Sequence, residues 1–504
     1  MNGCSACLSD EIFYTPRLDE GIIKAAHECG PAPGVFDPTG CSLDDAMSEA
    51  QEPIFRPHPV VLYFAQCELK KSDPFRTHPS ILLDEKAEII MQALDLFCIE
   101  GCVISIAAGA NRLFFRVACA SEYDQKKLID HQAQMAQMLN VNTIGVGPVQ
   151  PVDSDRLEWD HWRDEEIYGC GDDDDSELDA ECKEWLISIE RQGHHLQIEM
   201  RNPYPLHLGD LFIGEWLDRE IRRKSGKQPD LPLILGRDDD GVEIILDFAQ
   251  INHLLVGGTS RDETTSFLRS ILLGWSCCRL PHELRLILID RNKTAFNDLQ
   301  MDPYLAHPVV HSHQEELTVL KWAACHISER TKLLHSRNVE TIEAYWNSLE
   351  QHPSQVADLE SSEILPRIAI VINEFTDLAR AHGDEVEALI CEIARLGHTV
   401  GVHLLLTTQD AAQVADGFVG AMIPNRICFQ TETGRESQTL FNCDGAELLL
   451  GDGDMLIQTQ NNVVRAQGAS VSSEEIKNVC QVINTALSRY DQELFRISDS
   501  DLQS

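Results

Sequence analysis

From about residue 231 onward, short apolar runs rich in β-branched residues alternate with longer segments that have the apolar periodicity of amphipathic helices. The runs predict strands at 253–256, 285–290, 368–372, 402–407 and 426–430. The longer segments predict helices at 264–277, 315–334 and 384–396. Strands that alternate with helices form mainly parallel sheets covered by helices on both faces, so this half of the chain is predicted to have an α/β fold.

The rest of the chain is predicted to form separate units, because 504 residues exceed what one hydrophobic core holds. Residues 1–81 are rich in Pro, Gly and Cys and predict an irregular extension with a short element at 60–65. A small α+β subdomain is predicted from helices and strands at 83–97, 102–107, 112–119, 125–139, 141–146, 188–191 and 196–201. The predicted units are therefore the extension, the subdomain at 82–150 and 182–230, the α/β domain at 231–490, and an acidic tail at 491–504.

Charge restricts the partners that such a chain can have. The net charge is −41, and residues 151–181 hold fourteen Asp and Glu against two Arg, including the run Asp172–Asp175. This stretch predicts an acidic, solvated insertion; the alternative is a mimic of DNA phosphates or a clamp for a basic partner. Because DNA would be repelled overall, binding requires a local basic patch such as 222–224, or a partner protein.

No run of about 18 apolar residues is present, and the N-terminus lacks the pattern of a signal peptide, which predicts a cytoplasmic protein without a membrane span. In that compartment the 17 cysteines favour reduced thiols. Zinc at Cys4 and Cys7 with Cys29 and Cys41 is the alternative. The histidines between 307 and 335 lack the spacing of metal ligands.

The junction of the first predicted α/β strand and helix is the usual place for a phosphate-binding loop of the form GxxxxGK[ST]. Gly258 fits the first glycine of that form, and Thr265 keeps the hydroxyl that would hold magnesium. The second glycine is replaced by Glu263 and the lysine by Thr264. The four positions between Gly258 and Glu263 are Thr259, Ser260, Arg261 and Asp262. The loop alone therefore does not identify a nucleotide site.

The surrounding segments do resemble a known family. INHLLVGGTS at 251–260 resembles the strand and loop that enter the phosphate site of the FtsK/SpoIIIE family of DNA translocases. ILPRIAIVINEFTDL at 364–378 resembles its Walker B strand, and VGVHLLLTTQD at 400–410 its sensor strand. Further segments follow in family order at 232–250, 284–293, 302–312, 423–431, 444–457 and 464–476, and the subdomain at 82–210 resembles the family's α subdomain.

This resemblance implies a RecA-like P-loop NTPase motor that moves double-stranded DNA through a hexameric ring, with ATP and Mg as cofactors. It implies that Glu374 polarises the attacking water, that Gln409 senses the γ-phosphate and that Arg426 faces a neighbouring protomer. Asn373 occupies the position of the magnesium-organising Asp, and Asp410 stands where the family has an arginine. With Glu263 near the phosphates and no lysine, the site is predicted to be eroded. Gly451, Gly453 and Asp454 are expected to form only a tight turn.

The sequence leads to three hypotheses about function. In the first, the chain is a scaffold with an eroded site that assembles with DNA machinery or with an active FtsK-type ATPase. In the second, it is an active soluble DNA translocase in which Arg261 replaces the lysine. In the third, it is a scaffold related to type VII secretion ATPases. The family's winged-helix γ domain is expected to be absent, since only one helix is predicted after residue 476. The membrane-spanning N-terminal region of the family's cell-division members is expected to be absent too.

Overall fold

The computed structural model describes residues 79–487, 496, 497 and 502, with internal gaps at 109–111, 142, 149–159, 162–193, 202–205, 213–230, 239–240, 352–364, 411–413, 415–416, 442–443 and 460–461. The N-terminal extension with its cysteines, most of the acidic insertion, the basic stretch at 222–224 and most of the tail lie outside the described residues. Among the described residues, no helix has both the length and the apolarity to cross a membrane.

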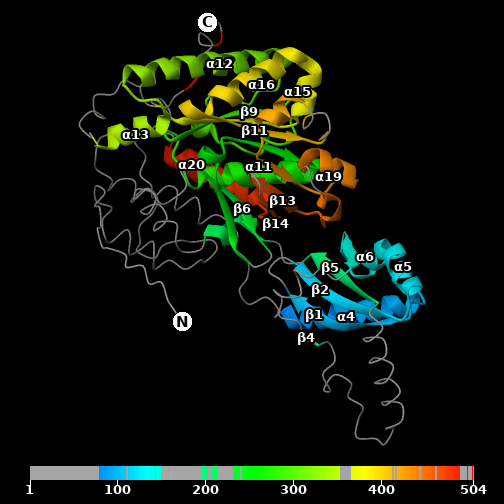
Figure 1. Ribbon diagram of the computed structural model, residues 1–504. Coiled ribbons are helices and arrows are strands. Elements are labelled where there is room, and N and C mark those ends of the chain that lie inside the picture. The colour runs from blue at the N-terminus through cyan, green and yellow to red at the C-terminus, as the bar shows by residue number, and fades with distance from the viewer. Residues whose placement is uncertain are drawn as a thin grey trace, which may run out of the picture.

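The larger domain is built on a nine-stranded sheet in the order β7-β6-β14-β13-β12-β8-β11-β10-β9 (Figure 1). Five neighbouring strands are parallel: β12 (Arg426–Cys428), β8 (His253–Gly257), β11 (Val402–Thr408), β10 (Arg367–Ile372) and β9 (Leu284–Ile289). The remaining four pair antiparallel: β7 (Glu243–Asp247), β6 (Pro232–Arg237), β14 (Asn462–Gly468) and β13 (Asp454–Thr459). The predicted α/β fold class is confirmed, and the sheet is mixed because β6–β7 and β13–β14 are joined by connections too short for a parallel crossover.

Helices cover both faces of this sheet, as predicted, because successive side chains of the parallel strands point to opposite faces. Leu286 and Val371 pack with α11 (Arg261–Ser276) and α20 (Ser473–Leu487) in one core, while Ile287 and Ile370 pack with α12 (His313–Ser336) and α16 (Asp384–Leu396) in another. The helices of this domain are α10 (Phe248–Ile251), α11 (Arg261–Ser276), α12 (His313–Ser336), α13 (Ile342–Gln351), α15 (Phe375–His382), α16 (Asp384–Leu396), α18 (Phe418–Met422), α19 (Gly434–Phe441) and α20 (Ser473–Leu487), with short 3-10 turns η2 (Asp302–Tyr304), η4 (His398–Val400) and η5 (Ala446–Leu448).

The smaller domain has an antiparallel five-stranded sheet in the order β3-β5-β2-β1-β4. Its elements are α4 (Pro79–Leu96), β1 (Gly101–Ala108), β2 (Arg112–Cys119), α5 (Glu122–Asp130), α6 (Gln132–Met138), β3 (Ile144–Pro148), β4 (Asp160–His161) and β5 (His195–Arg201), followed by the 3-10 turn η1 (Leu208–Phe212). The single helix predicted at 125–139 is two helices that meet at His131. Within the predicted acidic insertion, Asp160 and His161 pair with β1.

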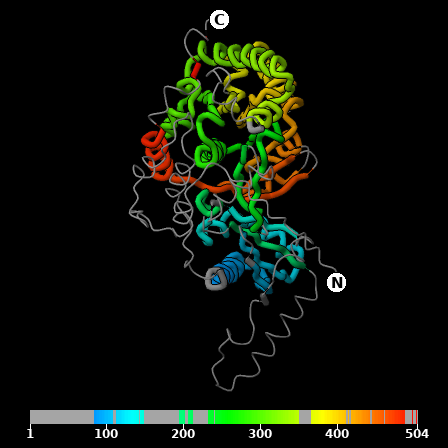
Figure 2. Tube along the Cα trace, turned by 90° about the vertical axis from the view of Figure 1, so that its left-hand side faces the viewer, coloured from blue at the N-terminus to red at the C-terminus, as the bar shows by residue number. Residues whose placement is uncertain are grey.

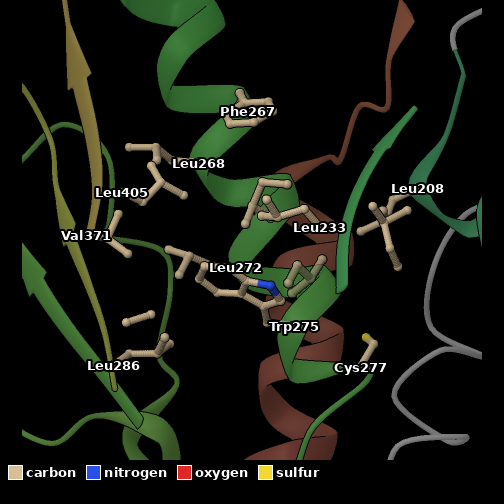
Figure 3. Packing of buried hydrophobic residues seen from close by; sticks show 14 of the residues in the cluster. Leu208, Leu233, Phe267, Leu268, Leu272, Trp275, Cys277, Leu286, Val371 and Leu405 are labelled. Atoms are coloured by element: carbon tan, nitrogen blue, oxygen red, sulfur yellow. The ribbon is translucent and has the colours of Figure 1, made fainter. Parts of the chain in front are cut away.

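One apolar helix face holds the larger domain together on the side of α11. Trp275 is fully buried and lies among Leu233, Leu272 and Cys277 (Figure 3). Its ring stacks on Phe248 with centroids 5.3 Å apart. Because this helix begins at the candidate phosphate loop, its packing fixes the position of the loop relative to the strand ends.

We therefore expect Trp275→Ala to lower the free energy of unfolding by about 3–5 kcal/mol, through lost burial and the cavity left behind. Phe418→Ala is the control, because Phe418 is 75% exposed and a change there should stay within about 0.5 kcal/mol. Urea unfolding of both variants provides the measurement, and equal losses would contradict this account of the core.

Candidate nucleotide-binding site

A cleft of about 400 Å³ opens where the parallel strands end. Its walls come from the segments that follow β8, β10, β11 and β12, the edge at which ligands bind in open α/β sheets. The lining residues are Gly258, Thr259, Arg261, Glu374, Thr376, Asp377, Arg380, Gln409, Asp410, Thr431 and Glu436. Of the predicted site residues, the structure thus brings Gly258, Thr259, Arg261, Glu374 and Gln409 together.

Helix α11 begins at Arg261, three residues earlier than the sequence pattern predicts. Ser260 caps it, since its side-chain oxygen accepts a hydrogen bond from the Glu263 N–H at 3.4 Å. Thr264 is buried, and its hydroxyl donates to the Arg261 carbonyl at 3.0 Å. Positions 261–265 are therefore the first turns of a helix, whereas GxxxxGK[ST] places most of them in a loop between strand and helix.

The sequence contains the signal for this early start. Ser260 followed three residues later by Glu263 is a capping-box pattern, and two acidic residues in the first turn favour a helix N-terminus there. Gly258 has a packing reason as well, because a Cβ at that position would lie 2.7 Å from the Phe429 Cβ.

Glu263 does not line the cleft, which corrects the expectation that its carboxylate lies near phosphates. Its Oε1 instead accepts a hydrogen bond from the Gly453 N–H at 3.2 Å. Burial raises the pKa of Glu263 to about 6, and the nearby Asp452 and Asp454 add to that shift against the backbone hydrogen bonds. The turn at 451–453, expected to be only a tight turn, is thus the partner of this side chain.

Glu374 is held in a strained backbone conformation at the edge of the cleft. Its φ of 62° and ψ of 69° are left-handed, and its N–H donates to Thr407 Oγ1 at 3.0 Å. The carboxylate is largely buried, with Oε2 4.0 Å from Arg261 Nη2. Burial, reinforced by Asp377, raises the pKa of Glu374 to about 7, although Arg261 opposes the shift.

Asn373 is part of a buried hydrogen-bond network. Its Nδ2 donates to Asp290 Oδ1 at 3.0 Å and to Thr294 Oγ1 at 3.1 Å, and its Oδ1 accepts from Thr407 Oγ1 at 3.3 Å. Asp290 Oδ2 accepts from the Ala295 N–H at 2.8 Å. The sequence analysis missed Asp290, although its position directly after β9 marks it as a strand-end carboxylate.

Three polar atoms near the strand ends are buried without a hydrogen-bond partner: Thr265 Oγ1, Glu374 Oε1 and Gln409 Nε2. Two charged groups that line the cleft form an ion pair, in which Arg380 Nη2 lies 3.2 Å from Asp410 Oδ2. The lining has four acids, Glu374, Asp377, Asp410 and Glu436, against two arginines, Arg261 and Arg380, a formal balance of −2.

Arg426 does not reach the cleft. It is buried, and its guanidinium donates to the Leu440 carbonyl and, at 3.0 Å, to the Gly420 carbonyl. It therefore fixes α18 and α19 to β12. The expectation that it faces a neighbouring protomer is corrected by this burial.

These residues do not fit a magnesium-bound triphosphate. The lining contains no lysine and carries excess negative charge, the loop positions are helical, and the Asn373 amide is already hydrogen bonded within the protein. The unpartnered Thr265 hydroxyl is the feature that fits magnesium. Among the described residues, no group of three or more His, Cys, Asp or Glu side chains is placed to hold a metal ion.

Residues 218–413 match the profile of the FtsK/SpoIIIE family. The chain is 32% identical over 268 residues to DNA translocase FtsK of Pseudomonas aeruginosa, covering 50% of this chain and 33% of that protein. It is 30% identical over 295 residues to DNA translocase FtsK of Haemophilus influenzae, covering 54% of this chain and 55% of that protein. The match thus spans between about a third and a little over half of these relatives.

Two solved structures are similar at low identity. The monomer form of the pCW3 conjugation coupling protein TcpA with ATPgS is 16% identical with a TM-score of 0.49, covering 80% of this chain and 99% of that one. The cytoplasmic domain of the Thermomonospora curvata type VII secretion ATPase EccC is 23% identical with a TM-score of 0.42, covering 50% of this chain and 31% of that one.

Asn373→Asp tests the buried network. It would place a carboxylate 3.0 Å from Asp290 Oδ1 and remove two donated hydrogen bonds, so we expect a loss of about 1–3 kcal/mol in the free energy of unfolding. Millimolar Mg²⁺ should restore part of it, since paired carboxylates are magnesium ligands. The control is Asn292→Asp, which breaks an exposed amide-to-carboxylate bond to Asp377. Equal losses at 373 and 292 would contradict the assignment.

Glu374→Gln tests the burial of the Glu374 carboxylate. In the folded protein its pKa is about 7 against 4.5 for the ordinary group, so the folded state binds the proton more tightly. The stabilisation by that proton is complete below pH 4.5 and is lost as the pH rises to 7. The variant should therefore gain stability over the wild type across this range, by up to about 3 kcal/mol. A difference that does not change with pH would refute the shift.

Proposed function

We propose that the chain, whose residues 218–413 match the profile of the FtsK/SpoIIIE family, is a motor-like scaffold of DNA-handling machinery that does not hydrolyse ATP. One observation carries the proposal: α11 begins at Arg261, so a capped helix occupies the positions of the phosphate loop. In a working loop, glycines let successive backbone N–H groups close around the phosphates. Here the Glu263 and Thr264 N–H groups point to Ser260 instead.

The charges support the same conclusion. The cation that would replace the missing lysine is Arg261, and the carboxylate that would polarise water is Glu374; these two face each other at 4.0 Å. A triphosphate entering the cleft would have to separate them and meet three further carboxylates. Like charges at a few Å in a partly desolvated cleft oppose binding by several kcal/mol.

An active translocase with an altered loop is the second candidate, and one observation favours it. Arg261 lies on the cleft wall, and the Thr265 hydroxyl is buried without a partner, so both a cation and a magnesium ligand remain near their expected positions. ATP and Mg would then be cofactors, and a ring of this chain or a mixed ring with an active FtsK-type ATPase would be the assembly.

Calorimetric titration with ATP and Mg²⁺, followed by an ATPase assay, separates the candidates. We expect no hydrolysis by the wild type, and recovered nucleotide binding in Glu263→Gly/Thr264→Lys/Asn373→Asp, which frees the loop, adds the cation and restores the metal ligand. Each single change should recover little, because the three positions serve one ligand and their effects are not additive. Hydrolysis by the wild type that Glu374→Gln abolishes would overturn the scaffold proposal.

Double-stranded DNA is proposed as a weak ligand, either directly or through a partner. With a net charge of −41, we expect affinity in the non-specific range, roughly 10⁻⁴ to 10⁻⁶ M, that falls steeply with salt. Changing Asp172–Asp175 to Asn removes four negative charges and leaves the paired Asp160 and His161 unchanged. Tighter DNA binding by this variant in fluorescence anisotropy would show repulsion, and unchanged affinity would exclude that role for the acidic run.

A further inference from the structure

Three of the described helices, α11, α12 and α20, begin with the pattern Ser-x-x-Glu, and in each the Ser side-chain oxygen accepts from the Glu N–H. At α20 the capping box is complete: the Glu475 N–H donates to Ser472 Oγ at 3.3 Å, and Glu475 Oε2 accepts from the Ser472 N–H at 2.8 Å. At α11 only the first half forms, from the Glu263 N–H to Ser260 Oγ. The Glu263 carboxylate accepts its hydrogen bond from Gly453 instead of turning back to the cap.

The segment that receives Glu263 is a strained turn of residues 451–453. Gly451, Asp452 and Gly453 all have positive φ, at 77°, 53° and 93°. For Asp452 this conformation is uncommon and persists only where neighbouring contacts hold it. A second link joins the same regions, because the Thr259 N–H donates to the Gln430 carbonyl at 3.0 Å and Gln430 Nε2 donates to the Leu449 carbonyl at 2.6 Å.

The opposite side of this turn is bound to the smaller domain. Asp452 Oδ2 lies 2.9 Å from Nη1 of Arg201 at the end of β5. Asp454 accepts from Arg465, and Arg465 Nη2 also lies 2.8 Å from Glu199 Oε1 on β5. Figures 1 and 2 show β13 and β14 on the side of the large domain that faces the smaller one. Within four residues, the turn therefore contacts both the first turn of α11 and the sheet of the smaller domain.

We propose that the segment 451–454, bound by Glu263 on one side and on the other by Arg201 directly and by Glu199 through Arg465, couples the position of the smaller domain to the first turn of α11 at the cleft. A partner that displaces the smaller domain acts on α11 through Glu263, and a ligand that displaces the start of α11 acts on β5 by the same contacts. Coupling of this kind is reciprocal. It requires no nucleotide and is independent of whether the cleft hydrolyses ATP.

Hydrogen–deuterium exchange of the full chain tests the coupling from both ends. Asp452→Asn removes the charge that binds Arg201, and Asn tolerates the positive φ at this position. We expect this variant to raise exchange not only at the turn but also at residues 259–266, by about two- to fivefold, the range of a partly exposed ion pair. Glu263→Ala should raise exchange by a similar factor at residues 195–201.

Two matched variants make the result specific. Glu263→Gln keeps an oxygen that accepts from the Gly453 N–H, so exchange at 195–201 should stay at the wild-type level. Glu475→Ala breaks the complete Ser-x-x-Glu capping box of α20 and should raise exchange only around the start of that helix. If Asp452→Asn leaves 259–266 unchanged and Glu263→Ala leaves 195–201 unchanged, the turn is a local contact and the coupling proposal is overturned.

Discussion

The buried hydrogen bonds that join Asp290, Asn373 and Thr407 fix the ends of three neighbouring parallel strands, β9, β10 and β11, against one another. Because Thr407 also accepts from the Glu374 N–H, the same network holds that residue in its left-handed conformation. An Asp at position 373 would introduce a second charge beside Asp290, whereas the Asn donates to it. Both carboxylate oxygens of Asp290 therefore accept hydrogen bonds from within the protein.

The cleft lies at the carboxyl ends of the parallel strands, and several polar groups in and beside it bind partners inside the protein. Ser260 caps α11, Glu263 binds the 451–453 turn, Arg261 faces Glu374, and Arg380 faces Asp410. The contacts of Arg261 and Arg380 use the two cations that line the cleft, whereas the contact of Glu263 lies outside the cleft. At position 263 the structure gives a reason for the replacement of glycine that the sequence did not suggest: the Glu263 carboxylate binds Gly453, outside the cleft.

Most secondary structure was predictable because strands that are buried on both faces form continuous apolar runs, while the helices between them have an amphipathic period. Strands β8, β10 and β11 and helix α16 lie within a residue or two of their predicted bounds. The start of α11 was predicted too late, because the comparison with GxxxxGK[ST] treated Ser260 and Glu263 as loop positions, although their spacing is that of a helix cap. The antiparallel half of the sheet was not predicted, since pairing between distant strands such as β6 and β14 leaves no local pattern.

The sequence by itself determined the α/β fold class, the resemblance to the FtsK/SpoIIIE family and the absence of lysine and second glycine from the loop. Those features depend on residue type and on contacts between neighbours in the chain, which a sequence displays directly. Only the tertiary structure decided where side chains point: Glu263 toward Gly453, Arg426 into carbonyls of α18 and α19, and Asp290 onto Asn373. The partners of these side chains are distant in sequence or positioned by packing, so the direction of each side chain depends on how the strands and helices pack in the folded protein.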